Sequence, residues 1–239
     1  MSPPSQENDQ PTTGAPSGRR IEVLRPPSPL PYLDALEMQR ARRIAVEDGR
    51  MSNALFLLEH EPVITIGRSS KREHVLRTPK ELDEMGIALI EADRGGDVTY
   101  HGPGQLVAYP ILDLRLWRRS IRWYLRSLEE ILIRQLAGYG LDAGRQEGYT
   151  GVWVRGAKVA AIGVGIHNWV TFHGIALNVD PIMEHYACIV PCGIAGKPVS
   201  SLRALLGTAP PMPRVMDDFE REFLEYFGGS GAGGDHQQS

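Results

Sequence analysis

One cysteine of the chain stands where a thiol could act as a nucleophile. Cys192 lies between Pro191 and Gly193. The proline favours an extended conformation for the residue before it, and the glycine allows a sharp turn directly after the thiol. This pattern predicts an exposed thiol at the junction of a strand and a turn, where backbone N–H groups could stabilise an oxyanion. Cys188, in an apolar run, is predicted to be buried and inert.

Lys158 stands at the start of a run of small and apolar residues, Gly156-Ala-Lys-Val-Ala-Ala-Ile-Gly163. A lysine in this position either ends a strand and reaches solvent or lies at the rim of an apolar pocket. At a rim it could act as a charge partner or a proton carrier. The alanines and glycines beyond it leave space in a core, which suits a channel. The pattern leaves both interpretations open.

A third segment, Arg94-Gly-Gly-Asp-Val-Thr-Tyr-His-Gly-Pro-Gly-Gln105, is too rich in glycine for a regular helix. Glycine lets a ligand approach the backbone, and such a loop can direct several N–H groups at a carbonyl or an anion. The alternative is a tight turn between two strands. The absence of Gly-Lys-Ser/Thr after the glycines argues against a phosphate-binding P-loop.

Two further groups of side chains have structural as well as functional interpretations. His173 precedes Gly174 and an apolar strand, so it is either a hydrogen-bonded core histidine or part of a site. His185, Cys188 and Cys192 fit no standard zinc spacing and lack a fourth ligand, so no metal site is predicted.

The composition is that of an ordinary globular protein. The chain has 239 residues, 42% hydrophobic and 23% charged, with a net charge of -3. This balance gives no indication of nucleic-acid binding. Two cysteines are too few for a secreted disulfide scaffold. The N-terminal segment has no apolar signal region, and no stretch reaches the ~20 apolar residues of a membrane helix, so we expect a cytoplasmic protein with no membrane segment.

The organisation predicted is one folded domain between two disordered tails. Residues 1–18 are rich in proline, serine and glutamine, residues 228–239 are rich in glycine, and the domain is expected over 19–227. Apolar spacing predicts helices over 31–49, 120–139 with Ser120 as N-cap, and 213–227. Strands are predicted over 62–66, 87–92, 97–101, 105–112, 151–154, 158–166 and 170–179, with Asn168 in a hairpin between the last two. Mixed elements without strict alternation favour an α+β fold with a mixed, mostly antiparallel sheet flanked by helices.

A cluster of arginines surrounds the start of the second predicted helix. One interpretation is a solvated helix face, and the other is a dock for an acidic carrier protein, since complementary charge mainly raises the rate of association. The cluster comprises Arg115, Arg118, Arg119, Arg122 and Arg126.

Five segments in this order resemble the lipoyl(octanoyl) transferases of lipoate biosynthesis. They cover roughly residues 55–205, and the glycine-rich segment is the most specific of them. They are Glu61-Pro-Val-Ile-Thr-Ile-Gly-Arg-Ser69, Arg94 to Pro110, Lys158-Val-Ala-Ala-Ile-Gly163, His173-Gly-Ile-Ala-Leu-Asn178 and Pro191-Cys-Gly-Ile194. The sequence departs from the family at His60-Glu61-Pro62 and Lys71-Arg72, neither of which touches the expected chemistry.

The resemblance implies the fold of the biotin and lipoate protein ligases, with Cys192 as the acyl-thioester nucleophile and Lys158 as its partner. It also implies a substrate site formed by three segments. Its residues would be Arg94, Gly95, Gly96, Asp97, Val98, Thr99, Tyr100, His101, Ala161, Ile162, Gly163, Gly174, Ile175 and Ala176.

The activity implied is transfer of an octanoyl group from octanoyl-acyl carrier protein to a lysine of lipoyl domains, without a metal or another cofactor. The acceptors implied are the lipoyl domains of 2-oxoacid dehydrogenases and the glycine cleavage H protein, and the enzyme is expected to be a monomer. Two alternatives are an ATP-dependent lipoate or biotin protein ligase and a non-catalytic module that binds acyl carrier protein. A ligase needs no nucleophilic thiol, so the Pro-Cys-Gly turn argues against the first.

Overall fold

A computed structural model describes residues 18–70, 72–190 and 198–228, and the strands within these ranges form two sheets. In the main sheet only the β1–β2 pair is parallel, and the other neighbouring pairs are antiparallel. Across this sheet the order is β1 (Ile21–Leu24), β2 (Asn53–Leu58), β6 (Gln105–Ile111), β10 (Val170–Asn178), β9 (Ala157–His167), β8 (Tyr149–Val154) and β7 (Ala143–Gln146).

A smaller sheet contains three strands in the order β4 (Ala88–Glu91), β3 (Val63–Ile66) and β5 (Thr99–His101). Its β3–β4 pair is parallel and its β3–β5 pair is antiparallel. Because β5 is followed almost at once by β6, the chain passes from the small sheet into the centre of the main sheet. The glycine-rich segment therefore lies where the two sheets meet.

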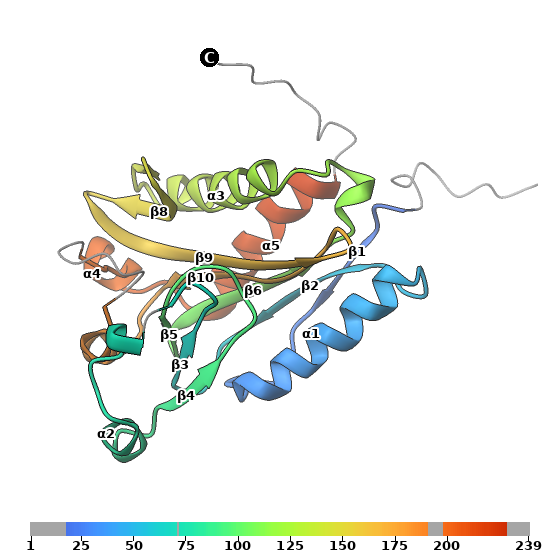
Figure 1. Ribbon diagram of the computed structural model, residues 1–239. Helices are drawn as coiled ribbons and strands as arrows, with labels where there is room; N and C mark the ends of the chain where they lie inside the picture. The colour runs from blue at the N-terminus through green and yellow to red at the C-terminus, as the bar shows by residue number, and fades with distance from the viewer. Residues whose placement is uncertain (1–17, 71, 191–197, 229–239) are drawn as a thin grey trace, which may run out of the picture.

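Helices cover the main sheet on both sides. The α-helices are α1 (Tyr32–Glu47), α2 (Pro79–Glu84), α3 (Ile121–Gly138), α4 (Leu202–Leu206) and α5 (Met212–Gly228), and short 3-10 turns are η1 (Arg72–His74), η2 (Leu114–Leu116) and η3 (Met183–Cys188). Figure 1 shows α3 and α5 on one side of the sheet and α1 with the small sheet on the other.

The core follows these layers. The largest apolar cluster joins α3 and α5 to the main sheet and includes Leu128, Leu132, Phe219 and Phe223, all fully buried. A second cluster packs α1 against the opposite face of the same sheet. A third lies within the small sheet and the segments that follow it. The sheet is thus buried on both faces. The face toward α1 and the small sheet is the one that can hold a site.

The predicted helices are confirmed, with bounds shifted by one or two residues. Ser120 is the N-cap of α3, since its Oγ accepts a hydrogen bond from the Trp123 backbone N–H at 3.3 Å. The apolar residues at four-residue spacing in α5 point into the core, where Val215, Phe219 and Phe223 are fully buried. Asn168 lies in the β9–β10 hairpin with a positive φ of 45°.

The seven predicted strands are also found, but the sequence missed β1, β2 and β7 and did not predict that the strands divide between two sheets. The segment Asn53–Leu58 has no β-branched residue and is buried at every position, so it shows no alternation to detect. The predicted tails lie almost wholly outside the described residues and stay predictions. No helix in the described ranges is both long enough and apolar enough to cross a bilayer.

Candidate functional site

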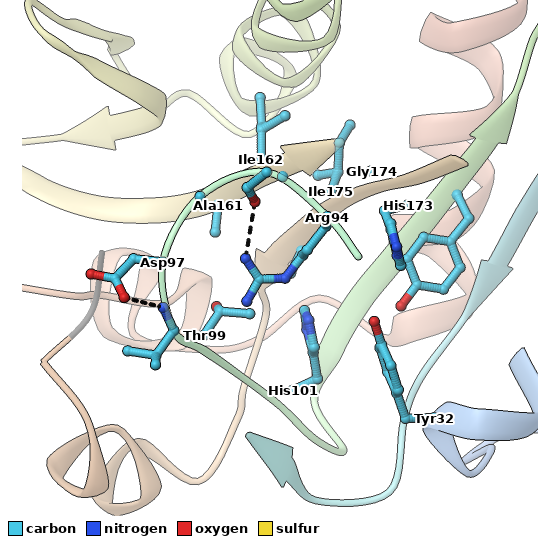
Figure 2. A pocket seen from close by; sticks show the side chains of 16 residues that line it. Tyr32, Arg94, Asp97, Thr99, His101, Ala161, Ile162, His173, Gly174 and Ile175 are labelled. Carbon is cyan, nitrogen blue, oxygen red and sulfur yellow. Dashed lines mark hydrogen bonds between the residues drawn. The ribbon is translucent and has the colours of Figure 1, made fainter. Parts of the chain in front are cut away.

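A central pocket lies between β9 and β10 of the main sheet and the loop that leads into β5. Figure 2 shows Ala161 and Asp97 toward one end of this pocket and Tyr32 with His173 toward the other. The space it encloses, its open mouth included, is about 490 Å³. Its lining consists of Tyr32, Arg94, Gly95, Gly96, Asp97, Val98, Thr99, His101, Tyr109, Ala161, Ile162, Gly163, His173, Gly174, Ile175 and Ala176.

The glycine-rich loop is tied to the strand beneath it. The N–H of Gly95 donates to the carbonyl of Val164 in β9 at 2.9 Å, so the loop lies directly over the strand. A Cβ on the nearby Gly67 would lie 2.4 Å from the Gly96 carbonyl oxygen, so only glycine fits there. Close backbone approach, which the glycines permit, is what forms this wall of the pocket.

Arg94 is a buried cation within the lining. Its Nη2 donates to the Thr65 carbonyl and to Thr65 Oγ1 at 2.8 Å each, and its Nη1 donates to the Gly95 carbonyl at 3.1 Å. Buried charges are stable only when their donors are satisfied in this way. These contacts join the loop to β3 and fix the guanidinium in the middle of the pocket, where Figure 2 shows it.

The end of the central pocket near Tyr32 and His101 is polar but uncharged, and His60 packs behind these two side chains. His60 Nδ1 donates to the Leu30 carbonyl at 2.8 Å, so its Nε2 accepts the hydrogen bond from the Tyr109 hydroxyl at 2.7 Å. Burial lowers the pKa of His60 to about 4 and the pKa of His101 well below its ordinary value. Burial also raises the pKa of Tyr32 to about 12. All these groups are therefore neutral at physiological pH.

His173 adopts a backbone conformation that is uncommon for a residue with a side chain. Its φ is 56°, and its N–H donates to Gln39 Oε1 of α1 at 2.8 Å instead of to a neighbouring strand. Its Nε2 lies 2.8 Å from Asp93 Oδ1, and burial lowers the pKa of His173 to about 4 although Asp93 opposes the shift. Such local distortion clusters at functional sites. His173 is thus both hydrogen-bonded and part of the lining, so both sequence interpretations apply.

Lys158, near the start of β9, is 9% exposed and its Nζ lies 5.1 Å from the centre of the Trp153 ring. Its backbone pairs with the segment that follows residue 197, since its N–H donates to the Pro198 carbonyl and its carbonyl accepts from Ser200. Cys192 lies outside the described residues. On its other side, the Val190 N–H donates to the His74 carbonyl at 2.8 Å.

The structure brings together the predicted substrate-site residues with one exception. Tyr100 is wholly buried in the small sheet, where its hydroxyl bonds His185 Nδ1 at 2.8 Å, and it does not line the central pocket. Sequence reasoning missed Tyr32 and Tyr109, which come from segments where nothing local indicates a site. Cys188 is buried as predicted.

Comparison with protein families places most of the chain in one of them. Residues 31–224 match the lipoyl protein ligase A/B catalytic domain. An octanoyltransferase of Chloroflexus aggregans is 50% identical over 189 residues, which are 78% of this chain and 86% of that protein. An octanoyltransferase of Gloeobacter violaceus is also 50% identical, over 75% of this chain and 79% of that protein.

A more distant similarity is found among solved structures. A bipartite lipoate protein ligase from Thermoplasma acidophilum superposes with a TM-score of 0.66 at 17% identity, covering 86% of this chain and 82% of that one. At this identity the likeness shows the fold alone. It confirms the predicted α+β fold of the lipoate protein ligases.

Proposed function

The chain belongs to the octanoyltransferases of the lipoyl protein ligase A/B family, and on that premise we propose that it transfers an octanoyl group through a thioester on Cys192. The donor is octanoyl-acyl carrier protein, and the acceptor is a lysine of a lipoyl domain. The observation that carries the proposal is 50% identity to octanoyltransferases over most of the chain.

In the first half-reaction the Cys192 thiolate attacks the carbonyl carbon of the octanoyl thioester. The bond between that carbon and the carrier sulfur breaks, and a thioester forms on Cys192. The Lys158 ammonium favours the thiolate by direct charge attraction and gives its proton to the departing carrier thiolate. One thioester replaces another, so the step needs no ATP.

In the second half-reaction the neutral amine of the acceptor lysine attacks the Cys192 thioester. An amide bond forms, the carbon–sulfur bond breaks, and the Cys192 thiolate is restored. The amine must lose a proton, and Lys158, left neutral by the first step, accepts it. The cycle thus returns both residues to their initial states.

The central pocket supports this assignment because part of its lining is apolar and can hold an uncharged acyl chain. Ile175 and Ala176 of β10 and Val98 of the loop provide buried apolar wall. Burial of a straight acyl chain stabilises the complex by roughly 0.8 kcal/mol per methylene. The polar groups near Tyr32 are neutral, and the Arg94 charge is satisfied by hydrogen bonds to Thr65 and Gly95, so neither requires a charged group on the chain.

The placement of Lys158 supports the proposed pairing with Cys192. Lys158 is paired through its backbone with Pro198, six residues beyond Cys192 along the chain. Six residues of extended chain reach at most about 20 Å, so chain length allows the proposed pairing. Both residues stand in the sequence contexts expected of them, which favours a catalyst over a non-catalytic acyl-binding module.

The partners follow from the same proposal. The Thermoplasma lipoate protein ligase is described with its E2 lipoyl domain, which is the kind of acceptor we propose here. We extend the proposal to the lipoyl domains of 2-oxoacid dehydrogenases and to the glycine cleavage H protein. The small number of cysteines supports a reducing, cytoplasmic location.

The competing function is an ATP-dependent ligase, because a lipoate-protein ligase A with bound ATP has a similar fold. The two are separated by mixing the purified protein with octanoyl-carrier protein and a lipoyl domain in the absence of ATP. We expect octanoyl amide on the lipoyl domain and one carrier thiol released for each amide. Lys158→Ala should slow both. Transfer that requires ATP and free octanoate would establish a ligase, and binding of the carrier without transfer would establish a binding module.

A further inference from the structure

The pairing of β8 with β9 contains one extra residue close to Lys158. Val152 pairs with Ala160, and the next residue of β8, Trp153, pairs with Lys158. One step along β8 therefore corresponds to two steps along β9, and Val159 is the additional residue. This is a β-bulge, a device that redirects side chains and is common beside active sites.

The bulge decides which face of the sheet Lys158 occupies. Beyond it, Ile162 and Val164 are partly buried and pack against the core shared with α3 and α5, and Ile162 also touches the central pocket. Ala161 and Gly163 line the pocket and are absent from that core. Figure 2 shows the side chains of Ala161 and Ile162 on opposite sides of β9. In a regular strand, residues an even number apart share a face. Lys158 would then share the core face of Ile162.

The extra residue removes this conflict. Val159 and Ala160 both belong to the core shared with α3 and α5, and they are 0% and 1% exposed. Two consecutive residues on one face return Lys158 to the face of Ala161. Its paired neighbour Trp153 is absent from that core, and the indole ring lies under the Lys158 ammonium at a distance suited to a cation–π contact.

Space for the redirected lysine comes from Gly151 in β8. Its φ is 132°, a conformation that side chains rarely adopt. A Cβ at this position would lie 2.7 Å from Lys158 Cε and 2.5 Å from the carbonyl oxygen of Ala160. An added methyl group must therefore displace either the lysine side chain or the bulged backbone.

The backbone of Gly151 is fixed by a hydrogen bond to a side chain of α3. The backbone N–H of Gly151 donates to Glu129 Oε1 at 3.2 Å. The other carboxylate oxygen accepts from Arg126 at 2.7 Å and from Arg145 at 3.1 Å, and the Glu129 side chain is only 2% exposed. A buried carboxylate with its acceptors satisfied is a rigid anchor.

We propose that Gly151, anchored by Glu129, is a positioning residue that holds Lys158 on the pocket face of β9. The inference rests on the proposed catalytic role of Lys158. It assigns no contact with substrate to Gly151 or Glu129, which act only through the lysine.

The test is steady-state octanoyl transfer by Gly151→Ala, with thermal unfolding measured alongside. A displacement of about 1 Å can cost 100-fold in rate, so we expect kcat to fall about 100-fold while KM for octanoyl-carrier protein stays the same. The matched control is Gly144→Ala in the neighbouring strand β7, where an added Cβ meets no atom within 4 Å. The control should keep the wild-type kcat.

A double-mutant cycle with Lys158→Ala tests whether Gly151→Ala lowers kcat by acting on the lysine. If Gly151 acts through the lysine, Gly151→Ala causes no further loss in the Lys158→Ala background. Two results would overturn this inference but leave the proposed role of Lys158 intact. One is that Gly151→Ala lowers kcat by the same factor in the Lys158→Ala background as in wild type. The other is a wild-type kcat for Gly151→Ala when Lys158→Ala is slow. A wild-type rate for Lys158→Ala would overturn the proposed role of the lysine and the inference with it.

A second variant serves if Gly151→Ala does not fold. Glu129→Asp keeps the carboxylate beside the two arginines but withdraws it by one methylene from the Gly151 N–H. We expect kcat to fall with KM unchanged, and a wild-type kcat in this variant would contradict the proposal.

Discussion

At the scale of single residues, burial controls the charge of the central pocket. His101 and His173 line it, His60 packs behind them against Tyr32 and His101, and burial lowers the pKa of all three histidines. Hydrogen bonds to the Leu30 carbonyl and the Tyr109 hydroxyl fix the His60 tautomer. The imidazoles of His101 and His173 are therefore a neutral part of the lining, against which an uncharged chain can lie.

The lowered pKa of His60 predicts acid sensitivity of the fold. An unfolded histidine binds a proton below about pH 6.5, whereas folded His60 does so only near pH 4. The unfolded state therefore gains protons first, and the free energy of unfolding falls by roughly 3 kcal/mol as pH decreases through this window. Urea unfolding of wild type and His60→Gln at pH 7 and pH 4.5 measures this, and the variant should lose less stability on acidification. An equal loss in both proteins would refute the assignment.

Single residues also show what the sequence could reveal about the site. Arg94 and Gly163 were identified because they belong to recognisable segments, and the structure places them in one pocket. Tyr32 comes from the first turn of α1 and Tyr109 from β6, and only the folded chain brings them there. Tyr100 was predicted to line the pocket but does not, because successive side chains of a strand point to opposite faces. Thr99 and His101 face the pocket, whereas Tyr100 packs in the small sheet.

At the scale of elements, periodicity predicted the helices well because each has one buried face. The phenylalanines of α5 are fully buried at four-residue steps. The strands were harder to assign. Which sheet β3, β4 and β5 join depends on long-range pairing, and the face of Lys158 depends on a bulge that shifts the alternation by one residue. Neither feature leaves a signal in local composition.

The position of α5 predicts that its core can be weakened without an effect on catalysis. Phe223 packs between α5 and the main sheet, on the face opposite α1 and the central pocket. Phe223→Ala should lower the free energy of unfolding by about 3–5 kcal/mol, because it leaves a cavity in a close-packed core. Denaturant unfolding and kcat measured on the folded fraction check this. A fall in kcat beyond the loss of folded protein would show that α5 couples to the site.

At the scale of the whole molecule, the arginine cluster spans a long distance: Arg115 lies far from Lys158, whereas Arg126 contacts Glu129 behind Gly151 and so lies near it. The segment before α3 pairs with the β9–β10 hairpin, since the Leu114 N–H donates to the Trp169 carbonyl at 2.8 Å. About ten residues of strand, or roughly 30 Å, separate that hairpin from Lys158. Arg115 and Arg126 are also engaged by Asp113 and Glu129. These ion pairs favour a solvated face over a carrier dock.

The central claim is a covalent octanoyl thioester on Cys192, and intact mass tests it most directly. Wild type, Cys192→Ser and the matched control Cys188→Ser are each mixed with octanoyl-carrier protein without an acceptor. We predict an octanoyl-sized gain on wild type and Cys188→Ser that hydroxylamine removes, and none on Cys192→Ser. No gain on wild type, or an equal gain on Cys192→Ser, would contradict the account.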